Sequence, residues 1–129
     1  MKSFILDTCA LIFALDSDQR AKDIQAFIDS YSVNVSVINF WEIAVKSAKG
    51  KLKLSVSLES LIKRCGASLH GVLPIIESDI LEYRNLLRIS DHKDPFDLML
   101  IAQCSRHGHL LLTTDSTLLK IYPRLTKNI

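Results

Sequence analysis

Residues 94–115 read DPFDLMLIAQCSRHGHLLLTTD, and this stretch carries the clearest signals of secondary structure in the chain. Asp94 is suited to cap a helix, and Pro95 is suited to its first position, where no backbone N–H is needed. Residues 98–102 are apolar on every side, so we expect a buried helix rather than an amphipathic one. Gly108 can end it, because glycine readily adopts the left-handed conformation found just past a helix. The stretch therefore predicts a buried helix followed by a strand.

Outward from this stretch, short apolar runs alternate with segments of helical periodicity. The apolar runs predict strands at residues 4–6, 33–35, 71–76 and 110–113. Helices are expected at residues 20–31, 36–49, 58–65, 79–87 and 116–121, with a helical turn at 11–15, Gly66 as a stop and an extended segment at 51–54. Strands that alternate with helices predict an α/β fold with a central parallel sheet of four or five strands flanked by helices. The tail YPRLTKNI is a thin candidate for the last strand.

Length and composition indicate one globular domain spanning residues 1–129, with 48% hydrophobic and 23% charged residues. The three cysteines, Cys9, Cys65 and Cys104, are widely spaced and form no zinc-type ligand pattern. Free thiols suit a reducing compartment. No apolar stretch is long enough to cross a membrane, and the amino terminus does not read as a signal peptide. We therefore expect a cytoplasmic protein.

The charges are unevenly distributed although the net charge is only +2. Residues 42–64 carry an excess of lysine and arginine, including Lys46, Lys49 and Lys51, whereas residues 77–97 carry an excess of acids. A basic block beside an acidic one suits a polyanionic partner held near a cation site. Two ordinary solvated faces would produce the same pattern, and charge alone favours that simpler explanation.

Four carboxylates are placed where a parallel sheet binds ligands. Asp7 follows the first strand, and Asp115 comes two residues after the fourth, and ligands bind beyond the carboxyl ends of such strands. Asp97 lies in the first turn of the buried helix, and Glu42 lies about two turns into the helix after the second strand. If the four converge, a cation must neutralise them, and Mg²⁺ prefers such oxygen ligands.

Each acid also has a structural explanation. Asp7 and Asp115 can act as turn or cap residues, and Asp94 is best explained as a helix cap. Glu42 can pair with Lys46 four residues later on an exposed helix, and Asp97 can complement the helix dipole. Singly, none of the acids is convincing, whereas four acids at one edge of a sheet are a stronger signal.

The four segments FILDTCAL, NFWEIAVKSAKGKLKL, HKDPFDLMLIAQCSRHG and LLLTTD together resemble PIN-domain proteins, and among them the VapC-type toxins of toxin–antitoxin pairs. The resemblance runs from about Ser3 to Leu119. It implies a PIN-like fold and endoribonuclease activity dependent on Mg²⁺ or Mn²⁺. It also implies a homodimer, inhibited by a small antitoxin that binds operator DNA.

The resemblance assigns the four site acids in chain order as Asp7, Glu42, Asp97 and Asp115. Asp7 and Asp97 would bind the metal directly and Asp115 directly or through water, while Glu42 would orient or deprotonate the attacking water. Asp94 also recurs in this form of the motif, but its cap geometry points away from a ligand role.

The basic block supplies the candidate RNA contacts, since Lys46, Lys49 and Lys51 can meet backbone phosphates. Phe40 and Trp41 can stack on a base, although the helical spacing favours a core position for Trp41. Two departures concern the edge of the site: Cys9 stands where relatives often carry Ser or His, and Leu98 where many carry Arg.

Two other functional classes compete with the nuclease. A haloacid-dehalogenase type of phosphotransfer enzyme needs a second Asp two residues after Asp7, where this chain has Cys9. A non-catalytic module of the same fold, acting through antitoxin or RNA binding, is the more serious rival. The retained set of four acids argues against it.

Overall fold

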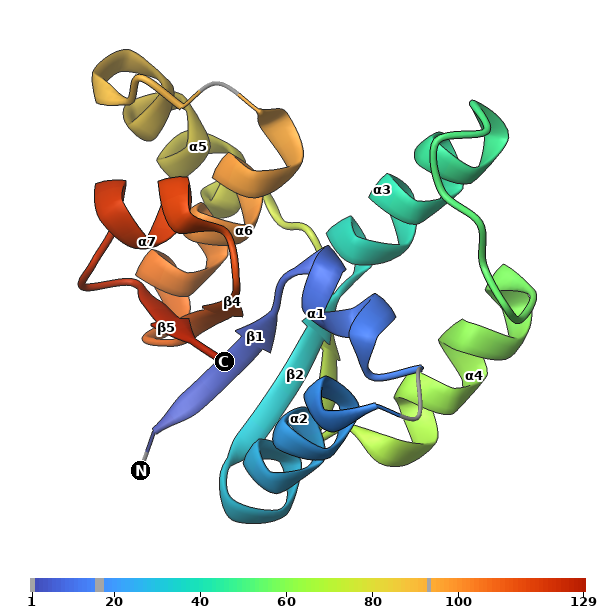
Figure 1. The fold of residues 1–129 in the computed structure, drawn as a ribbon. Coiled ribbons are helices and arrows are strands. Elements are labelled where there is room, and N and C mark those ends of the chain that lie inside the picture. The colour runs from blue at the N-terminus through green and yellow to red at the C-terminus, as the bar shows by residue number, and fades with distance from the viewer. Residues whose placement is uncertain (1, 16–17, 93) are drawn as a thin grey trace.

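The computed structural model describes residues 2–15, 18–92 and 94–129, and within these ranges it contains five strands and seven helices (Figure 1). The strands are β1 (Ser3–Leu6), β2 (Ser32–Ser36), β3 (Gly71–Leu73), β4 (Leu110–Thr113) and β5 (Thr126–Asn128). The helices are α1 (Thr8–Phe13), α2 (Gln19–Ser30), α3 (Val37–Ala48), α4 (Leu58–Ser68), α5 (Glu77–Ile89), α6 (Pro95–His107) and α7 (Ser116–Ile121).

All five strands are parallel and lie in the order β3-β2-β1-β4-β5, which confirms the predicted α/β sheet. The chain builds the sheet outward from β1 on one side through β2 and β3, and then on the other side through β4 and β5. The order therefore reverses between β1 and β4, where Ile5 lies opposite Leu111. Open sheets of this kind bind ligands beyond the carboxyl ends of the strands at such a reversal.

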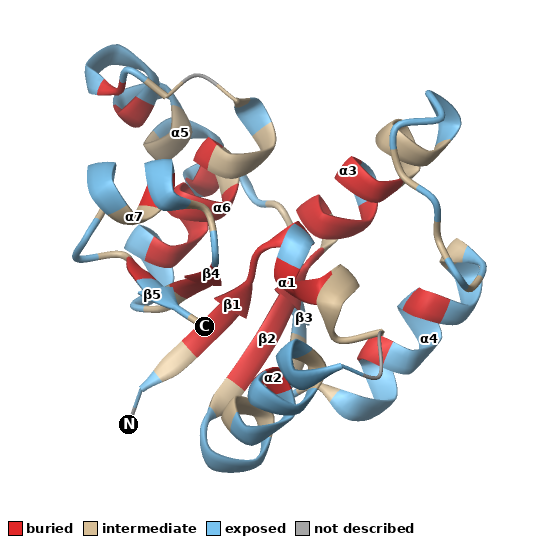
Figure 2. Ribbon diagram, viewed as in Figure 1, coloured by how far each residue is buried: buried red, intermediate tan, exposed pale blue. Residues whose placement is uncertain are grey.

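Helices cover both faces of the sheet, which explains why its inner strands are apolar without alternation. Phe4 and Leu6 of β1 pack in one buried cluster with residues of α1, α2 and α4. Ile5, on the opposite face, packs in a second cluster with residues of α6 and α7. Figure 2 shows buried central strands and exposed outer faces on the surrounding helices. Among the described residues, no helix is long and apolar enough to cross a membrane.

The predicted helix at 94–108 is confirmed with its ends. The Asp94 side chain accepts a hydrogen bond from the backbone N–H of Asp97, Pro95 is the first helical residue, and Gly108 follows with a φ of 72°.

The fully buried Asp79 of α5 joins this helix to α6 by hydrogen bonds. The Asp79 carboxylate accepts from Arg106 Nε at 2.9 Å and from Gln103 Nε2 at 3.2 Å. Burial acts to raise the pKa of Asp79, but these donors outweigh it, and the pKa is lowered.

Several local predictions differ from the structure in their bounds. The third strand ends at Leu73, because Pro74 has no N–H to donate to a neighbouring strand. Gly66 does not stop α4, which continues to Ser68. Residues 51–54, expected as an extended segment or a sheet edge, belong to none of the described strands, whereas the tail does supply β5. The helical turn expected at 11–15 is α1, which begins earlier, at Thr8.

Candidate active site

Asp7 lies at the carboxyl end of β1 and is only 4% exposed. One carboxylate oxygen accepts the backbone N–H of Ala10 at 2.7 Å, so Asp7 does cap α1. The other oxygen accepts the Thr113 hydroxyl from the neighbouring strand β4. Burial raises the pKa of Asp7 from 3.8 to about 6, although both hydrogen bonds act to lower it. The side chain is thus a cap and at the same time a carboxylate held in an unfavourable environment.

Glu42 is buried on α3 and belongs to a chain of side-chain hydrogen bonds. Its Oε1 accepts the Thr8 hydroxyl at 2.5 Å, and Thr8 in turn accepts from Asn39 Nδ2 at 3.1 Å. Its Oε2 accepts the ammonium of Lys46, four residues later. The i, i+4 pairing expected as a structural alternative is present. Glu42 is only 3% exposed, however, so this ion pair does not lie on an open helix face.

Asp97 lies in the first turn of α6, and its side chain is 22% exposed. Its Oδ2 is 2.8 Å from His92 Nε2, and the backbone around His92 is held by reciprocal hydrogen bonds with the Ser90 side chain. Burial is the main cause that raises the pKa of Asp97. His92 opposes it, while Asp94 and Glu42 add to the rise. One carboxylate oxygen of Asp94 accepts the hydrogen bond that caps α6, as the position of Asp94 in the sequence predicted.

Asp115 follows β4 and caps α7, where its Oδ1 accepts the N–H groups of Thr117 and Leu118 at 2.8 and 3.1 Å. The backbone N–H of Asp115 donates to the Thr113 hydroxyl at 3.0 Å, and that hydroxyl donates to Asp7. One threonine therefore connects the first and fourth predicted acids. The cap explanation for Asp115 is correct, and a second carboxylate oxygen remains for another role.

The acids influence each other, which means that the fold brings them together. After burial and the opposing hydrogen bonds, the charges of Asp97 and Glu42 raise the pKa of Asp7 further. Glu42 also raises the pKa of Asp97. The three side chains come from the end of β1, the middle of α3 and the start of α6, so the sheet and two helices are all needed to assemble them.

The donor set fits a hard divalent cation in chemistry but is not preassembled around one. Within residues 2–15, 18–92 and 94–129, no three Asp, Glu, His or Cys side chains are close enough to hold a single metal ion. Each acid is held by a donor of the protein instead: Asp7 by Thr113, Glu42 by Lys46 and Asp97 by His92. Burial raises the pKa of Asp7 and of Asp97 by more than these donors lower it.

The three predicted phosphate-binding lysines occupy different places. Lys46 points to Glu42, and this hydrogen bond is the main cause that raises the pKa of Lys46. Lys49 and Lys51 are exposed near the carboxyl end of α3, on either side of Gly50. Only Lys46 therefore belongs to the acid cluster, while the other two are available to solvent.

The prediction that Trp41 lies in the core is wrong. Its side chain is 55% exposed, and its ring meets Phe96 edge-on, with the ring centroids 5.1 Å apart. Periodicity identified the apolar face of α3, but the neighbouring helices leave part of that face open. Together the two rings border an apolar cavity of about 200 Å³ between α3, α5 and α6.

Four residues around the acids were not assigned from the sequence: Thr8, Asn39, His92 and Thr113. Asn39 stands three residues after the helix cap Ser36, which is a capping-box position, and it returns a hydrogen bond to the Ser36 backbone. His92 lies in the segment HKDPFD and Thr113 in the segment LLLTTD, each within five residues of a predicted acid. Their nearness in sequence could therefore have identified them as neighbours of the site. The contact between Thr8 and Glu42, 34 residues apart, depends on the tertiary fold alone.

The PIN domain family profile matches residues 4–123. Among curated proteins, no relative matches the chain. Several solved structures share its fold, all at less than 20% sequence identity.

VapBC2 from Rickettsia felis, bound to a DNA fragment from its promoter, superposes with a TM-score of 0.72 at 14% identity, covering 98% of both chains. A toxin–antitoxin complex from Klebsiella pneumoniae gives 0.69 at 16% identity, covering 95% of this chain and 94% of the other. DNA-bound VapBC from Salmonella typhimurium gives 0.67 at 18% identity, covering 99% and 98%. At these identities the neighbours establish the fold, and the profile match over most of the sequence establishes the family. This chain belongs to the PIN-domain family.

Proposed function

We propose that this protein is a metal-dependent endoribonuclease that hydrolyses RNA phosphodiester bonds and acts as the toxin of a toxin–antitoxin pair. The observation that carries the proposal is the convergence of Asp7, Glu42 and Asp97 at the carboxyl edge of the sheet, where burial raises the pKa of two of them. Family membership supports a nuclease, and the fold is shared with toxins solved in toxin–antitoxin complexes.

In this proposal Asp7 and Asp97 hold Mg²⁺ or Mn²⁺, and Asp115 contributes its second oxygen directly or through water. A divalent ion at such a site polarises a phosphoryl oxygen and lowers the pKa of water. Glu42 orients the attacking water and accepts its proton, a role for which its Oε1 is aligned by Thr8. Lys46 pairs with Glu42 and contributes positive charge beside the scissile phosphate, while Lys49 and Lys51 bind phosphates farther along the strand.

The test is cleavage of RNA by the purified chain in Mg²⁺, in Mn²⁺ and in EDTA. We expect cleavage only with a divalent ion, and a loss of about 100-fold or more in Glu42→Gln, the usual range for a general base. Glu59→Gln, on the exposed first turn of α4, is the matched control and should cleave normally. If the folded protein binds RNA but never cleaves it with either ion, the non-catalytic alternative is correct.

We also propose a small antitoxin partner, a homodimer and a cytoplasmic location. The structural neighbours include toxin–antitoxin complexes, and four of the exposed side chains of α5 are large and apolar: Ile80, Leu81, Leu87 and Ile89. Exposed apolar patches of this kind mark protein interfaces. The three cysteines are unpaired, as in a reducing compartment. Light scattering should give twice the chain mass, and Ile80→Glu should reduce it to one; a monomer at all concentrations would contradict the dimer.

A further inference from the structure

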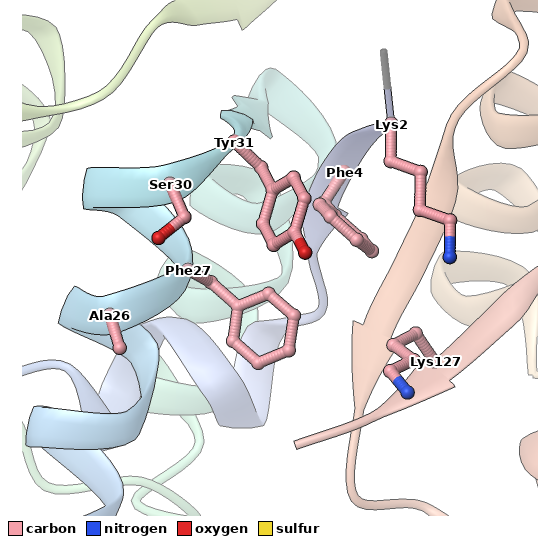
Figure 3. Close-up of a pocket in the computed structure, with 7 residues that line it drawn as sticks. All are labelled: Lys2, Phe4, Ala26, Phe27, Ser30, Tyr31 and Lys127. Carbon is pink, nitrogen blue, oxygen red and sulfur yellow. The ribbon is translucent and has the colours of Figure 1, made fainter.

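A cavity of about 360 Å³ lies near the amino-terminal end of β1 (Figure 3). It is lined by Lys2, Phe4, Ala26, Phe27, Ser30, Tyr31 and Lys127. Lys2 and Asp7 flank the two ends of β1 and are five residues apart, which is about 17 Å at the usual rise of an extended chain. The cavity is therefore separate from the acid cluster, and its volume lies within the range of small-molecule sites.

One side of the cavity is aromatic. The rings of Phe27 and Tyr31 lie 5.9 Å apart between centroids and are inclined by 37°, so they form a broad, nearly continuous surface. Phe4 meets both rings edge-on at 5.3 and 5.4 Å and is buried behind them, which fixes their positions. Tyr31 is 38% exposed, and Ala26 beside it leaves space for a ligand.

The other side of the cavity is positively charged. Figure 3 shows the amines of Lys2 and Lys127 across the space from the rings of Phe27 and Tyr31, with Lys127 on β5. None of the lining residues is acidic, and neither ammonium has an ion-pair partner among the described residues. The nearest acids along α2, Asp23 and Asp29, already accept from Gln19 and Gln25 on the same helix. This side of the cavity is therefore suited to an anionic group.

We propose that this cavity binds a nucleotide unit, with the base against Phe27 and Tyr31 and the phosphate between Lys2 and Lys127. Every nucleobase has a flat face that stacks on aromatic side chains, and lysine is a common point-charge partner of phosphate. An acidic peptide fits less well, since an Asp or Glu side chain has no flat ring to stack on Phe27 and Tyr31. The nucleotide is either free or part of a nucleic acid strand. The proposal does not depend on the acids being catalytic.

The experiment is a titration of the ¹⁵N-labelled full chain, in EDTA, with 5′-AMP, followed by NMR. We expect the shifts to change at residues 26–31 and at Lys127, and not around Asp7 and Asp97. Tyr31→Leu should weaken binding about tenfold, within the range for loss of one stacking ring, and Tyr31→Phe should retain it. The double variant of Lys2→Gln and Lys127→Gln should bind AMP no better than adenosine. Lys22→Gln, the same change at an exposed position of α2, is the control and should leave binding unaltered.

Further arms of the titration separate the sources of the ligand. Tighter binding of a short RNA than of AMP at the same residues supports a strand, and tighter binding of AMP supports a free nucleotide. The proposal is overturned if AMP causes no shift at these residues, or if the Tyr31 and lysine variants bind as the parent does. Equal binding of adenosine and AMP by the parent also overturns it. Binding of an acetylated Phe-Asp peptide in place of AMP would assign the cavity to a protein partner instead.

Discussion

Replacing Asp7 with Asn should stabilise the metal-free protein, although it removes a proposed metal ligand. The pKa of Asp7 rises from 3.8 to about 6 in the folded protein because the side chain is buried. The folded state therefore binds the proton more tightly than the unfolded state, and ionisation favours unfolding. Stability is lost as the pH rises through 4 to 6, and the penalty at pH 7.5 approaches about 3 kcal/mol, against about 0.5 kcal/mol at pH 4.

Asparagine keeps the local structure while removing this penalty. Its side-chain oxygen can accept the Ala10 N–H, and Asn caps helices about as well as Asp. Its amide can donate to the Thr113 hydroxyl, which now donates to Asp7. Asp7→Asn should therefore raise the free energy of unfolding by up to about 3 kcal/mol at pH 7.5 in EDTA, and by much less at pH 4. The charge of Asp97 is one of the causes that raise the pKa of Asp7, and the variant should also remove this repulsion.

Urea denaturation of the parent and the variant at pH 4, 5.5 and 7.5, all in EDTA, measures this difference. Asp29→Asn is the matched control, because Asp29 is an exposed carboxylate hydrogen-bonded to Gln25, and the change there should be small at every pH. Repeating the series in Mg²⁺ should narrow the advantage of the variant, since the ion stabilises only the parent. If Asp7→Asn lowers stability at pH 7.5, or if its effect does not grow with pH, burial of an uncompensated charge is the wrong explanation.

Three further predictions concern the metal, the cap residue Asp94 and the two exposed lysines. Mg²⁺ or Mn²⁺ at 100 times its Kd should stabilise the parent by about 2.7 kcal/mol. The Asp97→Asn variant should lose both this stabilisation and RNA cleavage. An unchanged melting temperature of the parent would contradict a metal site. Asp94→Asn should be nearly silent in thermal melts and cleavage assays, whereas Asp94→Ala should cost about 1 kcal/mol and keep much of the activity, unless Asp94 and not Asp97 is the third acid. Replacing Lys49 and Lys51 together with Gln should make the negative slope of log affinity against log salt, for single-stranded RNA, less steep by about 1.4. An unchanged slope would mean that the RNA binds elsewhere.

Those features that depend on local signals could be predicted from the sequence. The ends of α6 follow from Asp94, Pro95 and Gly108, each of which acts within one turn of the helix. The placement of Asp7 and Asp115 follows from the apolar strands that precede them, because parallel strands end at a common edge. The order of the strands did not follow from these signals, since nothing local determines which side of β1 receives β4.

The hydrogen bonds and the burial that shift the pKa values of the acids could not be predicted, because they depend on contacts between elements far apart in the sequence. The pairing of Glu42 with Lys46 was available from spacing, but its burial depends on how α3 packs against α1. The exposure of Trp41 depends on how much of α3 is covered by α5 and α6. A sequence pattern identifies an apolar face, but it does not show how far the neighbouring helices extend over it.

The acids are compensated by three different kinds of donor, and this difference bears on how a cation would bind. The Asp7 carboxylate is held by a neutral hydroxyl, so its charge is the least balanced, and its pKa is raised by burial to about 6. Glu42 is held by an ammonium, so its charge is balanced without a metal. Asp97 lies between these cases, because its partner His92 carries charge only when protonated. A divalent ion therefore gains most at Asp7 and Asp97, where it relieves unbalanced charge, and least at Glu42, which it would have to share with Lys46. This ordering supports the proposal that Asp7 and Asp97 are the metal ligands and that Glu42 orients and deprotonates the water.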